Sequence, residues 1–116
     1  MSAAEARLMV GTPGDPRAWV RVANTLLDGI TSGQFKPGQA VPSRNDLAHR
    51  FGVSPITAAR GVRELAGMRI ICRVPGLGYY VSVSFALAME QAIQDGSLTA
   101  VPSGAAGRRA VTKRRE

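Results

Sequence analysis

Residues 43–62, with the sequence SRNDLAHRFGVSPITAARGV, predict two short helices joined by a very tight turn. Ser43 is a residue type that caps helices, and Gly52 supplies the backbone freedom that the turn requires. Ser54 is placed to cap the next helix, and Pro55 takes its first position, where no backbone N–H is needed. The stretch therefore predicts two helices held at a fixed angle to each other.

The first of these helices is expected over about residues 44–51 and the second from residue 55 to about residue 66. The apolar spacing of the second helix predicts an inward face of Ala58, Val62 and Leu65. Its outward positions are Ile56, Ala59, Arg60 and Arg63. Ile56 can either be exposed or pack inward.

A longer helix is predicted upstream, because apolar residues recur at three- and four-residue spacing from Trp19 to Ile30. Asp15 is a candidate N-cap, followed by proline at the first helical position, and Gly33 can end the helix. Trp19 is expected to be a core or interface anchor. The connector FKPGQAVP (residues 35–42) is rich in turn residues.

Downstream, the period changes from that of a helix to that of a strand. MRIICRV (residues 68–74) and YYVSV (residues 79–83) predict a hairpin closed by PGLG. Cys72, the single cysteine, is expected to be a small buried hydrophobe. A last helix is predicted over FALAMEQAIQD (residues 85–95), with Ser84 as a candidate cap.

This order predicts an α+β fold: a winged helix-turn-helix of three helices and a β-hairpin wing, with a short C-terminal helix and a disordered tail. The expected organisation has four parts: a flexible arm over 1–15, the winged-helix domain over 16–83, the C-terminal helix over 84–96 and a disordered basic tail over 97–116. A tail of small, polar and basic residues does not bury enough apolar surface to fold.

Such a fold suits double-stranded DNA. The major groove is about 12 Å wide and admits one helix, while the preceding helix braces against the backbone. The 116 residues carry a formal net charge of +7, and residues 16–83 hold nine Lys and Arg against three acids. A basic domain of this kind favours an anionic partner. The basic tail, from Arg108 to Arg115, can either add affinity for any DNA or be a solvated end.

Other classes of protein are disfavoured by what the sequence lacks. One His and one Cys cannot form a metal site, and no paired carboxylates, nucleophilic triad or phosphate loop indicates an enzyme or a cofactor. The first residues lack the pattern of a secretory signal, and no apolar stretch approaches the roughly 18 residues of a membrane span. A cytoplasmic protein is expected, associated with the bacterial nucleoid when bound to DNA, with no membrane partner.

Five short motifs in order give a resemblance to a known family. They are ITSGQFKPG (30–38), VPSRNDLA (41–48), RFGVS (50–54), REL (63–65) and PGLGYYV (75–81). Over residues 17–82 the chain resembles the DNA-binding domain of GntR-type transcriptional regulators. The resemblance implies that DNA is contacted by the starts of the second and third helices and by the wing.

The implied DNA-binding residues are Arg44, Asn45, Ser54, Pro55, Ile56, Thr57, Arg60, Arg63, Arg73, Gly76, Leu77 and Gly78. Several positions depart from the family pattern. Asn45, Pro55 and Ala59 stand where arginine is frequent, and Leu77 stands where the wing tip is often basic. Arg69 replaces a common helix-ending glycine, and Gly61 lies inside the recognition helix, where glycine costs roughly 1 kcal/mol against alanine.

The first functional hypothesis is a sequence-specific DNA-binding regulator, most simply a repressor that binds an operator as a homodimer. The helix over residues 85–95 is a candidate dimer element, with Phe85, Leu87 and either Met89 or Ala92 at the seam; alternatively it packs on its own domain. The second hypothesis is a protein-interaction module or a non-specific DNA-binding accessory protein. Only 33 residues follow the wing, so no small-molecule effector site is expected.

Overall fold

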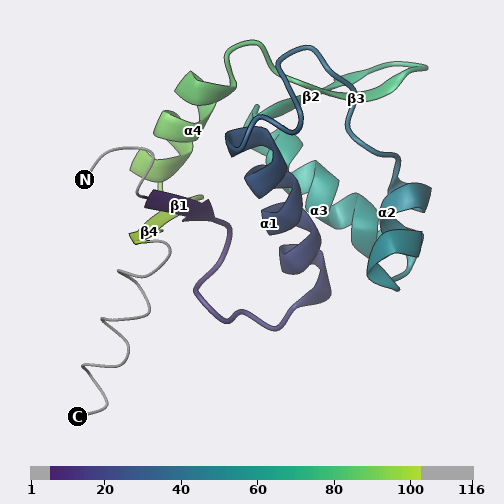
Figure 1. Cartoon of the computed structure of the whole chain (residues 1–116), viewed down its shortest axis with the longest axis horizontal. Helices are drawn as coiled ribbons and strands as arrows, with labels where there is room; N and C mark the ends of the chain where they lie inside the picture. The colour runs from purple at the N-terminus through teal and green to yellow at the C-terminus, as the bar shows by residue number, and fades with distance from the viewer. Residues whose placement is uncertain (1–5, 103–116) are drawn as a thin grey trace.

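The computed structural model describes residues 6–102. The elements are, in chain order, β1 (Ala6–Met9), α1 (Ala18–Thr31), α2 (Arg44–Phe51), α3 (Pro55–Gly67), β2 (Ile71–Val74), β3 (Gly78–Val81), α4 (Phe85–Gln94) and β4 (Thr99–Pro102). Strand β1 pairs with β4 and β2 pairs with β3, both antiparallel. In Figure 1, α2 and the β2–β3 wing lie at one end of the molecule, and α4 with the β1–β4 pair lies at the other. The predicted winged helix-turn-helix and its α+β class are confirmed.

The helix-turn-helix is built by the two caps that the sequence predicts. The side-chain oxygen of Ser43 accepts a hydrogen bond from the N–H of Asp46 at 3.1 Å. That of Ser54 accepts from the N–H of Thr57, also at 3.1 Å. Between the helices, Gly52 has a φ of 64°, in the left-handed region that favours glycine. The angle between α2 and α3 is therefore fixed by local sequence.

The predicted start of α1 is wrong by two residues. The N-cap is Arg17, whose side chain makes no capping bond, and the helix begins at Ala18. Asp15 instead accepts a hydrogen bond from the backbone N–H of Arg17 at 3.0 Å, ahead of the helix. Pro16 thus precedes the cap and does not occupy the first helical position. After the helix, Gly33 adopts a φ of 89°.

The core forms where α1 crosses α3. Most of the largest buried side chains come from these two helices and include Leu26, Leu27, Ile30 and Leu65. At the crossing stands Gly61, where an added Cβ would lie 2.9 Å from the carbonyl oxygen of Trp19. The same Cβ would lie 3.0 Å from Cγ1 of Val22. Gly61 is therefore required by the close approach of the two helix backbones.

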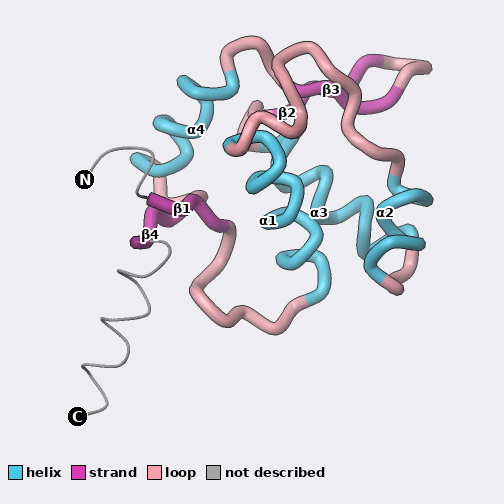
Figure 2. The backbone as a smooth tube through the Cα atoms, in the orientation of Figure 1, coloured by secondary structure: helices cyan, strands magenta, loops and turns pink. Residues whose placement is uncertain are grey.

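The connector between α1 and α2 pairs with the wing. The N–H of Gly38 donates to the carbonyl of Val81 at 2.8 Å, and the N–H of Val41 donates to that of Tyr79 at 3.0 Å. Ala40 forms an isolated bridge with Tyr80. Figure 2 shows this loop running beside the strands of the hairpin before it enters α2. The wing and the start of α2 are thereby tied together.

Both wing strands are shorter than predicted: β3 ends at Val81, and β2 begins only at Ile71 because residues 68–70 close α3 instead. Arg69 has a φ of 67° and its N–H donates to Ala66, while the N–H of Ile70 donates to Leu65. This pair of bonds is a Schellman motif, which normally places glycine at the left-handed position. The buried side chains of Leu65 and Ile70 accompany it.

The expectation that Cys72 is buried is wrong. Its thiol side chain is exposed, whereas the preceding residue, Ile71, is buried. Successive side chains of a strand point to opposite faces, and only one face of this two-stranded hairpin is covered by the core. Cys72 therefore lies on the outer face of the wing, opposite Tyr80 in register.

The predictions of a flexible arm and a disordered tail are wrong for residues 6–9 and 99–102, which pair as β1 and β4. The pair is held to α1 by Asn24, whose amide oxygen accepts from the N–H of Val10 at 2.7 Å and whose amide nitrogen donates to the Val10 carbonyl at 3.1 Å. Met9, Val10 and Leu98 are buried. The remaining tail, with its basic residues from 108 to 115, lies outside the described residues.

Helix α4 packs on its own domain through Ala88, Met89 and Ala92, which are buried. Of the residues predicted at a dimer seam, Leu87 alone is a large exposed hydrophobe, at 56% exposure. Ser84 is the N-cap residue, as predicted, but its side chain makes no capping hydrogen bond. Within the described part of the chain, no helix is both long and apolar enough to cross a membrane.

Replacing Gly61 tests the close helix crossing. We expect Gly61→Ala to lower the free energy of unfolding by about 1–2 kcal/mol, because overpacking outweighs the gain in helix propensity. Gly67→Ala is the matched control in the same helix, since nothing lies within 4 Å of an added Cβ there. The control should be neutral or slightly stabilising in denaturant unfolding. Equal stabilisation by both changes would contradict the crossing.

Replacing Arg69 tests the strained helix end. Arg69→Gly should raise the free energy of unfolding by roughly 0.5–1 kcal/mol, because glycine adopts positive φ without the steric cost of a Cβ. Arg69→Ala removes the same charge but keeps the Cβ, so it should give no gain. If both variants were stabilised alike, the effect would come from charge and the strain argument would be wrong.

Candidate nucleic-acid interface

The start of α3 presents an apolar side chain between polar ones. Ile56 is 77% exposed, which settles that it does not pack inward. Ser54 donates through its hydroxyl to Oγ1 of Thr57 at 3.0 Å, in addition to its capping role. Because Thr57 accepts this bond, its own hydroxyl hydrogen remains available to an outside acceptor. Pro55 is exposed beside them.

The start of α2 is also open to solvent. Arg44 and Asn45 occupy its first two positions and are exposed. The first backbone N–H groups of a helix and its dipole favour an anion at this end. Arg44 adds a full positive charge at the same place.

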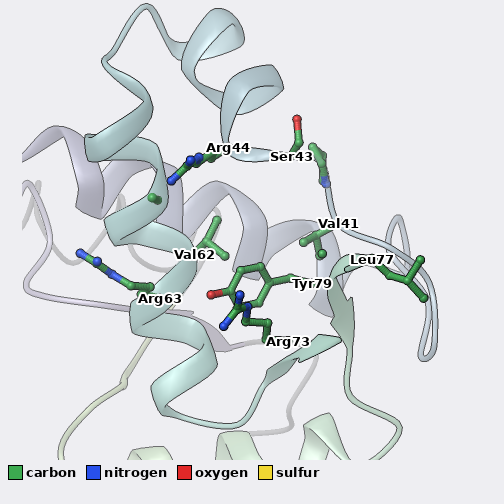
Figure 3. Close-up of a pocket in the computed structure, with 11 residues that line it drawn as sticks. Val41, Ser43, Arg44, Val62, Arg63, Arg73, Leu77 and Tyr79 are labelled. Carbon is green, nitrogen blue, oxygen red and sulfur yellow. The ribbon is translucent and has the colours of Figure 1, made fainter. Parts of the chain in front are cut away.

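Between the start of α2, the middle of α3 and the wing lies a hollow of about 480 Å³ (Figure 3). Its apolar floor includes Val41 and Val62, with the ring of Tyr79 beside them. Three arginines come to it from three different elements: Arg44 from α2, Arg63 from α3 and Arg73 from β2. The other lining residues are Pro42, Ser43, Ala59, Leu77 and Gly78. We call this region the arginine hollow.

The arginine hollow is positively charged without compensation from its own walls. None of its lining residues is acidic. Within residues 6–102 the ion pairs are Arg7 with Asp28 and Arg17 with Asp15, each at 2.8 Å, and both lie outside the hollow. Arg63 therefore makes no ion pair with an acid among the described residues. The three guanidinium groups are free to meet an anion.

The wing tip closes one side of the hollow with a turn that needs glycine. Gly76 and Gly78 have φ values of 81° and 105°, and the N–H of Leu77 donates to Val74 at 2.9 Å. Leu77 is 69% exposed at the tip. Arg73 lies opposite Tyr79 in the strand register. The wing thus offers a narrow, apolar tip with one cation behind it.

Arg60 and Arg63 are both outward positions of α3, but their side chains have different surroundings. At about 100° per residue, Ile56 lies between them on the exposed front of the helix. Arg63 lines the arginine hollow, whereas the guanidinium carbon of Arg60 lies 4.4 Å from the ring centre of Trp19 on α1. The exposed front of α3 is therefore bordered by one arginine on each side.

The comparisons with known proteins agree with this geometry. A family model described as "Bacterial regulatory proteins, gntR family" matches residues 19–81, which is more than half of the chain. The chain belongs to this family. The match begins at Trp19 in α1 and ends at Val81 in the wing, so it covers all of the elements that surround the hollow.

Three proteins illustrate the similarity within the gntR family. The mannosyl-D-glycerate transport/metabolism system repressor MngR of Escherichia coli (strain K12) is 34% identical over 61 residues, 53% of this chain and 25% of that protein. A GntR family transcriptional regulator from Listeria monocytogenes superposes with a TM-score of 0.60 at 26% identity, over 73% of each chain. AraR(DBD) in complex with operator ORR3 gives a TM-score of 0.57 at 26% identity, over 63% of this chain and 88% of that one. The chain spans about a quarter of the length of the curated relatives it matches.

The structure gathers only some of the residues predicted from the gntR resemblance. Arg44, Arg63, Arg73, Leu77 and Gly78 meet at the hollow. The other predicted residues do not line the hollow: Asn45, Arg60, Gly76 and the four residues 54–57 at the start of α3.

Several participants were not among the predicted DNA-binding residues. Tyr79 and Val41 line the hollow, and Trp19 contacts Arg60. No local pattern indicates these contacts, because each joins elements that are far apart along the chain. Among residues 6–102, no group of three or more His, Cys, Asp or Glu side chains is placed to hold a metal ion.

A testable charge coupling lies ahead of α1. Hydrogen bonds from Arg17 lower the pKa of Asp15 to about 2. An unfolded aspartate has a pKa of about 3.9, so the stabilising effect of Asp15 is present above about pH 4 and is lost as the pH falls towards 2. An NMR titration of the Asp15 carboxyl should show the low value in the native protein and a value nearer 3.9 in Arg17→Gln. An unchanged titration in the variant would refute the coupling.

Proposed function

We propose that the chain is a DNA-binding transcriptional regulator, most simply a repressor that occupies an operator. The observation that carries the proposal is the arginine hollow: three cations without ion pairs among the described residues, beside the exposed front of a helix-turn-helix. In the complex, the front of α3 would face base edges, and the arginine hollow would face backbone phosphates. Arginine is well suited to phosphate, because its planar group donates several hydrogen bonds at once.

Relatives support the regulatory role. MngR, 34% identical over the matched part, is a repressor, and AraR(DBD), 26% identical over the matched structure, was solved in complex with its operator. These names describe those proteins. For this chain they favour operator binding over an unrelated use of the same fold.

The proposed contacts divide by chemistry. Arg44, Arg63 and Arg73 bind phosphates from the hollow. Asn45, Ser54 and Thr57 offer neutral hydrogen-bonding groups to base edges or to backbone. Ile56, with Pro55 beside it, is placed for apolar contact with a thymine methyl group.

The wing would contact DNA differently from a wing with a basic residue at its tip. Leu77 carries no charge, while Gly76 and Gly78 allow the turn to approach the backbone closely. This favours van der Waals contact at the rim of the groove over insertion of a cation. A regulator of this kind acts in the bacterial cytoplasm, without catalysis.

Two copies would read a symmetric operator if the protein acts as a homodimer. Besides Leu87, the exposed hydrophobes near α4 are Val83, at 83% exposure, and Ile93, at 39%. Leu87 and Ile93 belong to α4 and Val83 shortly precedes it, and α4 lies at the other end of the molecule from α2 and the wing (Figure 1). A dimer formed there would leave both DNA-facing surfaces open.

The first test compares DNA from upstream of the protein's own gene with a scrambled duplex of the same length, at about 50 and 200 mM salt. A specific regulator should retain a preference of 10³ or more at the higher salt. Equal affinities that fall together with salt would indicate non-specific binding and would contradict operator recognition at this promoter. A pull-down of genomic DNA that enriches no site would then reject the proposal.

The second test removes the cations of the hollow one at a time. Arg63→Ala and Arg73→Ala should each reduce the slope of log affinity against log salt by about 0.9, and affinity roughly tenfold at about 0.1 M salt. Arg7→Ala is the matched control, since it removes one charge at the ion pair with Asp28. If Arg7→Ala lost as much affinity as the hollow variants, the overall charge of the protein, and no particular site, would attract the DNA.

A further inference from the structure

Two arginine side chains lie against one aromatic ring beside α3. The guanidinium carbons of Arg17 and Arg60 lie 4.9 Å and 4.4 Å from the ring centre of Trp19. Trp19 is half-buried, and its indole Nε1 is buried without a hydrogen-bond partner among the described residues. Core packing and the two cations therefore set the position of the ring.

The two arginines are in different situations. Arg17 is committed to Asp15: its Nε and Nη2 donate to the carboxylate at 3.0 Å and 2.8 Å. Arg60 is exposed and forms no ion pair within residues 6–102. Its guanidinium is thus held in place by the ring while its hydrogen-bond donors stay available.

The place of Arg60 on α3 decides what those donors can meet. It borders the exposed front of the helix on the side of α1, whereas Arg63 borders it on the side of the arginine hollow. The major groove is bordered by one phosphate backbone on each side, so a helix lying in it brings each flank near a different strand.

We propose that Arg60 contacts a phosphate of the backbone across the major groove from the arginine hollow, and that Trp19 is the positioning residue that holds it there. The inference rests on the proposed DNA-binding function. It gives Arg60 the role of fixing the register of the helix in the groove. Asp15 does not oppose such a contact, because Arg17 already pairs with its carboxylate.

A double-mutant cycle measured on a random-sequence duplex tests this proposal, since phosphate contacts do not depend on sequence. Arg60→Ala should reduce affinity roughly tenfold at about 0.1 M salt and the salt slope by about 0.9. Trp19→Leu should reduce affinity roughly three- to tenfold in the native background, because a free arginine must be ordered on binding. It should have no further effect in the Arg60→Ala background.

Conservative variants separate positioning from simple structural damage. Trp19→Phe keeps an aromatic face and should restore most of the affinity lost in Trp19→Leu. Arg60→Lys keeps the charge but loses the planar stack, so it should retain the salt slope and lose part of the affinity. Trp19 is the single tryptophan of the chain, so its fluorescence should change in Arg60→Ala and report the stack directly.

The outcomes distinguish the two proposals. If the native protein shows no salt-dependent affinity for DNA, the proposed function itself fails. If it binds and Arg60→Ala binds equally well, with an unchanged slope, only the Arg60 contact is refuted. If the effects of Trp19→Leu and Arg60→Ala simply add, Trp19 is structural and does not position Arg60. Should Trp19→Leu fail to fold, the two Arg60 variants and Trp19→Phe still decide the question.

Discussion

The contact on which the rest of the structure depends is the close crossing of α1 and α3 at Gly61. An added Cβ there would stand 2.9 Å from the backbone oxygen of Trp19, so the two helix backbones nearly touch. This separation fixes which residues of α3 face inward and which face out. It also places the ring of Trp19 against Arg60, a stack that contributes roughly 0.5–1 kcal/mol at exposed sites. Gly61 lowers the helix propensity of α3, but it allows α3 to pack this closely against α1.

A second constraint joins the wing to the start of α2. Backbone hydrogen bonds between the connector and β3 hold Val41 and Tyr79 together, and these residues form part of the floor of the arginine hollow. The cations around that floor are therefore presented by a braced framework. They lack ion pairs among the described residues, in contrast to Arg7 and Arg17. Exposed guanidinium groups are well solvated, so leaving them unpaired has little effect on stability while it keeps them available to an anion.

The parts of the fold that could be predicted from sequence are those set by neighbours along the chain. The caps at Ser43 and Ser54, the turn at Gly52 and the alternation in the wing are local, and they gave the helix-turn-helix and the hairpin correctly. The β1–β4 pair could not be predicted in the same way, because it joins residues ninety or more positions apart through two strands of only four residues each.

The same division holds at the candidate site. The exposed arginines could be proposed from helix periodicity and from family resemblance. The different surroundings of Arg60, which lies against Trp19, and of Arg63, which lines the hollow, could not be predicted. They depend on how α1 and the wing pack on either side of α3. Cys72 shows the limit of prediction from residue type. Cysteine is a residue type that favours burial, but strand β2 covers the core with one face only, and Cys72 lies on the other face.

The central claim is that the front of α3 and its two flanks face the DNA together. Amide chemical-shift mapping by NMR during titration with a DNA duplex tests it most directly. The account predicts that the largest shifts fall at the start of α2, at residues 54–63 and at the wing tip, with little change in α4 or the β1–β4 pair. Shifts concentrated on α4, around Leu87 and Ile93, with an unchanged front of α3, would contradict it.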